Sequence, residues 1–328
     1  MSLRLVKRAA AVAAVFATAC AVTGAAWGQA YPNRPINLVL PYSVGSSGDA
    51  AMRLLSERMS PLLGQPIVIE NQAGAAGLVG ADKGRLARPD GYTIVSMADS
   101  TLMYLPLLNK NANFDPLKDY ESITQITDIG WVLVTHPSLP VKTVAELVSY
   151  LKERPGKVDY ASGGVASPQQ IVMELFQKRT GTQLAHIPYK GSAPALTGVV
   201  GNQTPLMFSG IAVAIPFVND NRLRALATGG RARSPLMPNV PTLGEAGLDG
   251  FTFSSWISLM GPVGLPQDVV RALHGATTKA LADRALVERL RGIGMTVIAN
   301  TPEEFKANLG NEFKRLSGLV ADLGLKRE

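Results

Sequence analysis

Three short loops rich in serine and glycine carry the residues best suited to binding chemistry. Residues 45–48 read Gly-Ser-Ser-Gly, residues 162–164 read Ser-Gly-Gly with Ser167 close behind, and residues 191–192 read Gly-Ser. Each loop precedes a predicted helix, whose first turn offers unpaired N–H groups and the positive end of the helix dipole to a carboxylate or phosphate. Serine and glycine are also ordinary capping and turn residues, so it is the recurrence of the pattern that indicates an anion site.

The sequence offers little for catalysis or metal binding. His136, His186 and His274 are far apart in sequence, and we interpret each as a core or rim residue. No His-Glu-x-x-His motif, Gly-x-Ser-x-Gly elbow or P-loop occurs. Cys20 is the only cysteine, which excludes an intramolecular disulfide and any metal site with two thiolates. We therefore expect no catalytic residue, no metal and no cofactor.

Two series of alternating strands and helices must position these loops. With 328 residues, 46% of them apolar and 17% charged, the chain is long enough for two ordinary domains. Because strands and helices alternate, we expect parallel strands joined by crossover helices, an α/β fold. The predicted strands cover residues 37–40, 67–70, 92–96, 131–134, 158–161, 185–188, 205–208, 224–227 and 253–260, and a helical region follows.

The chain crosses between the two series twice, at residues 127–134 and 251–259. Neither stretch is rich in glycine or proline, so we expect short strand-like hinges rather than loose linkers. The prediction is a discontinuous domain 1 (31–130 plus 255–328) and a continuous domain 2 (131–254). Open α/β sheets bind ligands outside the carboxyl ends of their strands, which here places a ligand cleft between the domains.

Residues 1–30 have the pattern of a secretory signal. Arg4, Lys7 and Arg8 precede an apolar run, and small residues end at Ala30, where we expect cleavage. An uncleaved membrane anchor and lipidation at Cys20 are the alternatives. Cleavage removes three of the 32 basic residues and none of the 25 acidic ones, leaving a net charge of +4. That charge is too small to indicate nucleic-acid binding.

Several short motifs occur in an order that is typical of one family. They include Tyr-Pro-Asn-Arg-Pro-Ile at 31–36, Pro-Asp-Gly-Tyr-Thr at 89–93, Pro-Tyr-Lys-Gly-Ser-Ala-Pro-Ala at 188–195 and Val-Pro-Thr at 240–242. Over essentially all of residues 31–328 the sequence resembles the substrate-binding receptors of tripartite tricarboxylate transporters, the Bug family. The resemblance implies a type II periplasmic binding protein fold with the ligand cleft between two domains.

The resemblance also implies a function: binding a small carboxylic acid by domain closure and delivering it to membrane permease subunits of a tripartite tricarboxylate transporter. Such receptors hold the carboxylate with backbone amides, hydroxyls and ordered waters. We expect a periplasmic monomer that binds no nucleic acid. A sensor feeding a two-component signalling system and an exported small-acid hydrolase are the alternative functions, although the hydrolase lacks a visible base.

The candidate ligand residues lie in the loops at the predicted cleft. Among them, Asp49 is interpreted as a residue that favours the helix dipole or orients water, because it would repel an anion directly. The candidates are Tyr42, Ser43, Ser46, Ser47, Asp49, Asp99, Ser100, Ser162, Gly163, Ser167 and Ser209.

Three departures from the family pattern bear on the ligand. Residues 44–46 read Val-Gly-Ser where Pro-Gly-Gly is common. Residues 208–210 read Phe-Ser-Gly where many members have an aspartate at the second position, so we expect a ligand without a required positive charge. The turn at 71–73 also departs, and we expect it to lie away from the ligand. The identity of the carboxylic acid stays open.

Overall fold

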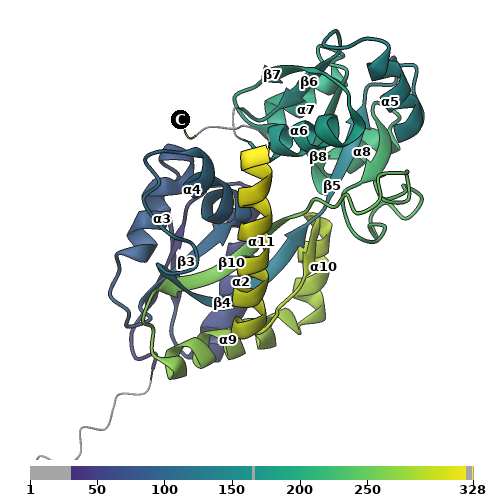
Figure 1. The fold of residues 1–328 in the computed structure, drawn as a ribbon. Helices are drawn as coiled ribbons and strands as arrows, with labels where there is room; N and C mark the ends of the chain where they lie inside the picture. Colours follow the sequence, from purple (N-terminus) through teal and green to yellow (C-terminus); the bar gives the residue numbers. More distant parts are fainter. Residues whose placement is uncertain (1–30, 165–166, 323–326, 328) are drawn as a thin grey trace, which may run out of the picture.

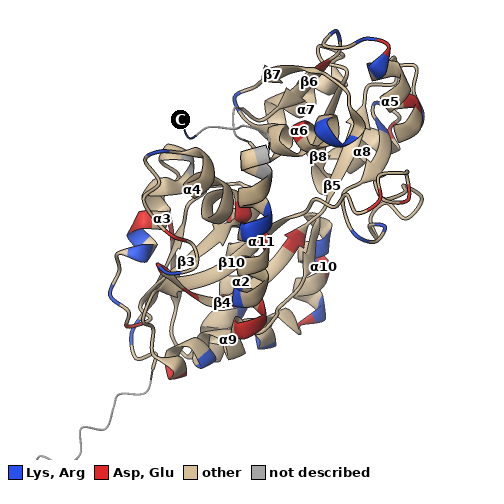
Figure 2. Cartoon of the chain, viewed as in Figure 1, with Lys and Arg blue, Asp and Glu red and all other residues tan. Residues whose placement is uncertain are grey.

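The computed structural model describes residues 31–164, 167–322 and 327, and it divides into two lobes that each contain one β-sheet (Figure 1). The predicted export segment, with Ala30 and Cys20, lies outside the described residues. Within the described ranges, no helix is both long and apolar enough to span a bilayer. Basic and acidic side chains are interspersed over both lobes (Figure 2).

The first sheet has the strand order β11-β4-β10-β3-β1-β2. Its parallel part is β1 (Ile36–Leu40), β2 (Ile67–Asn71) and β3 (Thr93–Ala98). β10 (Ser255–Pro262) runs antiparallel to both β3 and β4 (Tyr120–Ile129), and β11 (Met295–Val297) runs antiparallel to β4. The expectation of parallel strands was therefore wrong for β10, which re-enters the sheet from the second lobe, and for β11. β4 is antiparallel to β10 and so runs in the same direction as β3.

Helices cover both faces of the first sheet. One face packs against α2 (Ser47–Leu63), α9 (Gln267–Leu281) and α10 (Arg284–Gly292). The other face packs against α3 (Leu78–Arg85), a π-helical turn (Ser100–Tyr104), α4 (Leu105–Leu108) and α11 (Pro302–Asp322). Side chains alternate between the two faces along β10. Ile257 packs with the helices on the first face, and Trp256 packs with those on the other.

The second sheet has the order β7-β6-β8-β5-β9. β6 (Asp159–Ser162) runs parallel to β7 (Ala185–Pro188) and β8 (Leu206–Gly210). β5 (Trp131–Thr135) is antiparallel to β8 and β9 (Arg224–Thr228), so the expectation of parallel strands was wrong for β5 as well, because the chain enters this sheet directly from β4 without a crossover helix. One face packs against α5 (Val144–Lys152) and α6 (Pro168–Thr180), and the other against α7 (Ser192–Val200) and α8 (Ile211–Asn219). The remaining short element is a 3-10 turn at Ala75–Gly77.

The two crossings between the lobes are strand-like, as predicted, and they lie side by side. The first crossing is Gly130, between β4 and β5. The second is the segment that leads into β10 at Ser255. The Trp131 indole N–H donates to Ser255 Oγ at 3.0 Å, and the Gly229 N–H donates to the Trp131 carbonyl at 2.9 Å. The strand predicted from residue 253 begins at Ser255 because the Phe253 N–H pairs with the Gly229 carbonyl in the second lobe.

Replacing Trp131 with phenylalanine tests the hydrogen bond between the crossings. The change leaves the buried Ser255 hydroxyl without its donor, which we expect to lower the free energy of unfolding by about 1 kcal/mol more than a matched change does. Trp256→Phe is the match, because Trp256 is similarly buried beside the same crossing and has no indole hydrogen bond among the described residues. Equal losses in urea unfolding of the two variants would contradict this expectation.

Candidate functional site

The loops predicted to bind the ligand follow strands whose carboxyl ends face the crossings. In the first sheet, Ile129 at the end of β4 pairs with Ser255, and Ala98 at the end of β3 pairs with Ile257. In the second sheet, Trp131 at the start of β5 pairs with Gly210 at the end of β8. Because β1 is parallel to β3 and β6 is parallel to β8, the ends of all four strands lie at the edges nearest the other lobe. Every candidate residue lies at or just after one of these ends.

The first loop is held by contacts of its own side chains. Tyr42, which is half-buried, donates its hydroxyl hydrogen to the Ser96 carbonyl at 2.7 Å. Ser46 caps α2, and its hydroxyl accepts from the Asp49 N–H at 3.2 Å. Gly45 adopts a φ of 80°, which favours glycine at this turn. Ser43 and Ser47 are exposed, so their hydroxyls face solvent.

Asp49 is a buried anchor of this loop, with donors on both carboxylate oxygens. It accepts from the Gly45 N–H at 2.9 Å and from the Asn71 amide at 2.9 Å, and it pairs with the Arg53 guanidinium at 2.9 Å. Burial alone would raise the pKa of Asp49, but the hydrogen bonds from Arg53, Gly45 and Asn71 hold it below its usual value. The carboxylate is thus engaged within the protein, in keeping with an indirect role.

Two residues of this anchor were not anticipated. Arg53 could have been found from its i,i+4 spacing to Asp49 on the predicted helix. Asn71 had no local signal, and its turn was expected to lie away from the ligand. Its amide donates to Asp49 and, at 3.2 Å, to the Tyr42 carbonyl, so it contacts the candidate loop directly.

Asp99 is buried at the end of β3 and is connected to the crossings. Its carboxyl group is hydrogen-bonded by the Ser100 N–H, the Ser255 hydroxyl and the Trp256 N–H. Burial raises the pKa of Asp99 to about 7, and the negative charge of nearby Glu312 on α11 also raises it. The three hydrogen bonds act in the opposite direction and lower the pKa. Through Ser255, Asp99 joins the same hydrogen-bond chain as Trp131.

The second-lobe candidates occupy the starts of two neighbouring helices. Ser167 caps α6, with its hydroxyl accepting from the Gln170 N–H at 3.4 Å. Gly163 lies beside the start of α7, since its carbonyl accepts from the Gly191 N–H at 3.1 Å. Across this junction, the Gln169 amide contacts the Ser192 hydroxyl. Two helix starts therefore present their N–H groups at one edge of the second sheet, as the loop sequences predicted.

Ser162 and Ser209 are buried, so their hydroxyls belong to the lobe interior. The Ser162 hydroxyl lies 2.6 Å from His186 Nε2 and contacts the backbone of Gly164. A serine hydroxyl hydrogen-bonded to a histidine could also be the nucleophile and base of a hydrolase. Here the serine is fully buried, and burial lowers the pKa of His186, which is stacked on Tyr160 with ring centroids 4.9 Å apart. The arrangement fits a satisfied rim histidine, as interpreted from the sequence.

The two α/β lobes, the paired strand crossings and the helix starts around the space between them define the periplasmic binding protein fold. The sequence matches the tripartite tricarboxylate transporter family receptor, TctC, over residues 51–325, and the chain belongs to that family. Like the other members of the family and its structural neighbours, it is a solute-binding receptor and not an enzyme.

Individual relatives agree with this assignment. The chain is 32% identical to the protein BugT of Bordetella pertussis over 96% of this chain and 97% of BugT. It is similar in structure to MatC (Rpa3494) from Rhodopseudomonas palustris with bound malate: 29% identity, TM-score 0.77, covering 88% of this chain and 100% of MatC. It is also similar to R. palustris Rpa4515 with adipate: 28% identity, TM-score 0.81, covering 91% and 100% of the two chains.

The raised pKa of Asp99 predicts a specific pH dependence of stability. A carboxyl group with a pKa near 7 when folded and about 3.9 when unfolded contributes stability that is complete below pH 4 and is lost as the pH rises through 7. Asp99→Asn removes this titration. Between pH 4 and pH 8, the free energy of unfolding of the wild type should therefore fall relative to the variant by roughly 4 kcal/mol.

Urea unfolding of both proteins across this range provides the measurement. Asp220→Asn is the control, because it is the same Asp-to-Asn change at an exposed position at the end of α8, and the effect of Asp99→Asn is measured against it. A profile of Asp99→Asn that also runs parallel to the wild type would contradict the assignment of a buried, partly protonated carboxyl group.

Proposed function

We propose that this protein binds a small carboxylic acid between its lobes and delivers it to the membrane permease of a tripartite tricarboxylate transporter. The observation that supports the proposal is that three helices, α2, α6 and α7, begin after strand ends that lie nearest the other lobe. Helix starts from both lobes supply N–H donors to an anion without a cationic side chain. Family membership supports both the ligand class and the transport role.

Closure of the two lobes provides the mechanism. We place the moving bodies at residues 31–130 with 255–328 and at residues 131–254, joined by the paired crossings. A carboxylate between them satisfies donors of one lobe in the open form and donors of both lobes in the closed form. Since only the closed form makes both sets of contacts, the ligand shifts the population toward it.

The ligand contacts are assigned to backbone N–H groups and exposed hydroxyls rather than to the buried side chains. Ser43, Ser46, Ser47 and Ser167 lie at the helix starts. Asp49, Asp99, Ser162 and Ser209 are each almost fully buried and have partners within the protein, so we assign them to holding the loops in place. Tyr42, Ser100 and Gly163 complete the loops on both sides.

Comparing malate with aspartate tests the ligand class. Malate carries a hydroxyl group where aspartate carries an ammonium group. Residue 209 is a serine, where the family resemblance leads us to expect an aspartate in many members, so the expected partner for an ammonium group is missing. Malate is the ligand bound in the structure of MatC. By titration calorimetry we expect malate to bind at least tenfold more tightly than aspartate, a difference of about 1.4 kcal/mol. Aspartate binding as tightly as malate would contradict the expectation.

A wider panel guards against a wrong choice of acid. Succinate, adipate, citrate and nicotinate should be screened by thermal shift beside malate, because bound ligand raises the melting temperature in proportion to ln(1 + [L]/Kd). The proposal predicts that at least one of these acids stabilises the protein, and stabilisation by none would overturn it.

Small-angle scattering tests closure directly. The radius of gyration of the protein should fall when a stabilising acid from the panel is added to saturation, because the lobes approach each other. The scattering mass should correspond to a monomer throughout. A separate measurement tests cleavage of the export segment: mass spectrometry of protein exported to the periplasm should show that its first residue is Tyr31. A bound acid that leaves the radius of gyration unchanged would rule out closure as the mechanism.

A further inference from the structure

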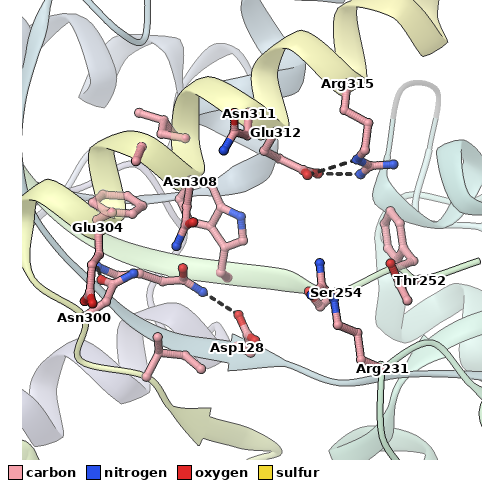
Figure 3. A pocket seen from close by; sticks show the side chains of 18 of the residues that line it. Asp128, Arg231, Thr252, Ser254, Asn300, Glu304, Asn308, Asn311, Glu312 and Arg315 are labelled. Carbon is pink, nitrogen blue, oxygen red and sulfur yellow. Dashed lines mark hydrogen bonds and ion pairs between the residues drawn. The ribbon is translucent and has the colours of Figure 1, made fainter. Parts of the chain in front are cut away.

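A pocket of about 930 Å³ lies between α11 and the segments that flank the second crossing (Figure 3). Its first-lobe wall includes Asp128 near the end of β4, Asn300 after β11 and Asn311 on α11. Its second-lobe wall includes Arg231, which follows β9, and Thr252, just before the backbone pairing of Phe253 with Gly229. None of the candidate ligand residues lines it.

The pocket lies on the opposite side of the crossings from the candidate ligand loops. In the first sheet the crossing strands are β4 and β10; the candidate loops follow β3 and β1 on one side, and the pocket reaches residues after β11 on the other. In the second sheet the crossing strand is β5; the candidate loops follow β8 and β6 on one side, and the pocket reaches residues after β9 on the other. The crossings therefore separate the two spaces in both lobes.

This placement couples the volume of the pocket to closure. Two lobes that rotate about a pair of adjacent strands approach on one side of those strands and separate on the other. We propose that this pocket, here called the rear pocket, is a control site of the receptor: whatever fills it favours the closed form, and whatever draws its walls together favours the open form. The inference rests on the closure mechanism proposed above.

Charges on the two walls act in a defined direction. Asp128 on the first-lobe wall is hydrogen-bonded by the Gln125 amide, and among the described residues no ion pair to it is found. Arg231 extends from the second-lobe wall toward Ser254 in Figure 3, and within the described ranges it has no ion pair. Because their charges are opposite, we expect their attraction to grow as the rear walls approach each other, which favours the open form. Glu312 and Arg315 on α11 already form their own ion pair.

Filling the rear pocket by mutation tests the inference without any ligand. Asn311→Trp places a large side chain in the pocket from an exposed position on α11. Lys314→Trp is the matched control, because Lys314 is exposed on the same helix and does not line the pocket. Small-angle scattering of the ligand-free proteins should show a smaller radius of gyration for Asn311→Trp and an unchanged one for Lys314→Trp.

A charge reversal provides a second, smaller perturbation. Arg231→Glu replaces attraction by repulsion against Asp128, so the ligand-free protein should again become more compact, and added salt should weaken the effect. This variant keeps the test decisive if the tryptophan variant fails to fold, which circular dichroism and thermal melting would reveal. Folded variants with the radius of gyration of the wild type would overturn the inference.

The outcomes are distinct from those that test the proposed function. If an acid of the panel compacts the wild type but neither variant is compact without ligand, closure stands and the rear pocket is not a control site. If the variants are compact while none of the acids binds, the coupling stands and the ligand class is wrong. For any acid that binds the wild type, Asn311→Trp should increase the affinity several-fold, since less of the ligand's binding energy is used to close the lobes.

Discussion

The two strands that cross between the lobes are tied to each other by hydrogen bonds, and the rest of the site depends on this tie. Trp131 donates to Ser255, and its carbonyl accepts from Gly229. Ser255 in turn hydrogen-bonds Asp99, the residue at the end of β3. All of these polar groups are buried or lie in the strand ladder, where each lost partner costs free energy. The chain of bonds therefore holds the two crossings together beside the strand ends that carry the candidate loops.

The polar groups around the proposed cleft are of two kinds: buried side chains and the backbone N–H groups of helix starts. Asp49 and Asp99 are buried and fully engaged by neighbouring donors, so they hold loops in place, with pKa values shifted in opposite directions. In the proposed site, the helix starts of α2, α6 and α7 direct their dipoles at the space between the lobes. A site made of backbone donors recognises a carboxylate by geometry. The hydroxyls and shape of the surrounding loops then contact the rest of the ligand.

The sheet order gives the receptor two faces about its hinge. Candidate loops and rear pocket lie on opposite sides of the crossing strands in both sheets, so any rotation that closes one space widens the other. The free energy of closure thus depends both on the interactions formed with the ligand and on those broken behind the hinge. On this proposal, side chains distant from the ligand, on α11 and after β9, influence the affinity.

The sequence by itself determined the family and the local structure, whereas only the tertiary structure decided which polar residues face inward. Helix starts at Ser46 and Ser167 were predicted because capping is decided by a few neighbouring residues. Antiparallel β10 was missed, since strand direction depends on where the chain re-enters a sheet. Asn71, at the end of β2, meets Asp49 on α2, and Ser255 is bonded across more than a hundred residues of chain. Such contacts arise from the packing of distant elements, and a carboxylate or hydroxyl in a sequence carries no sign of which remote donor will meet it.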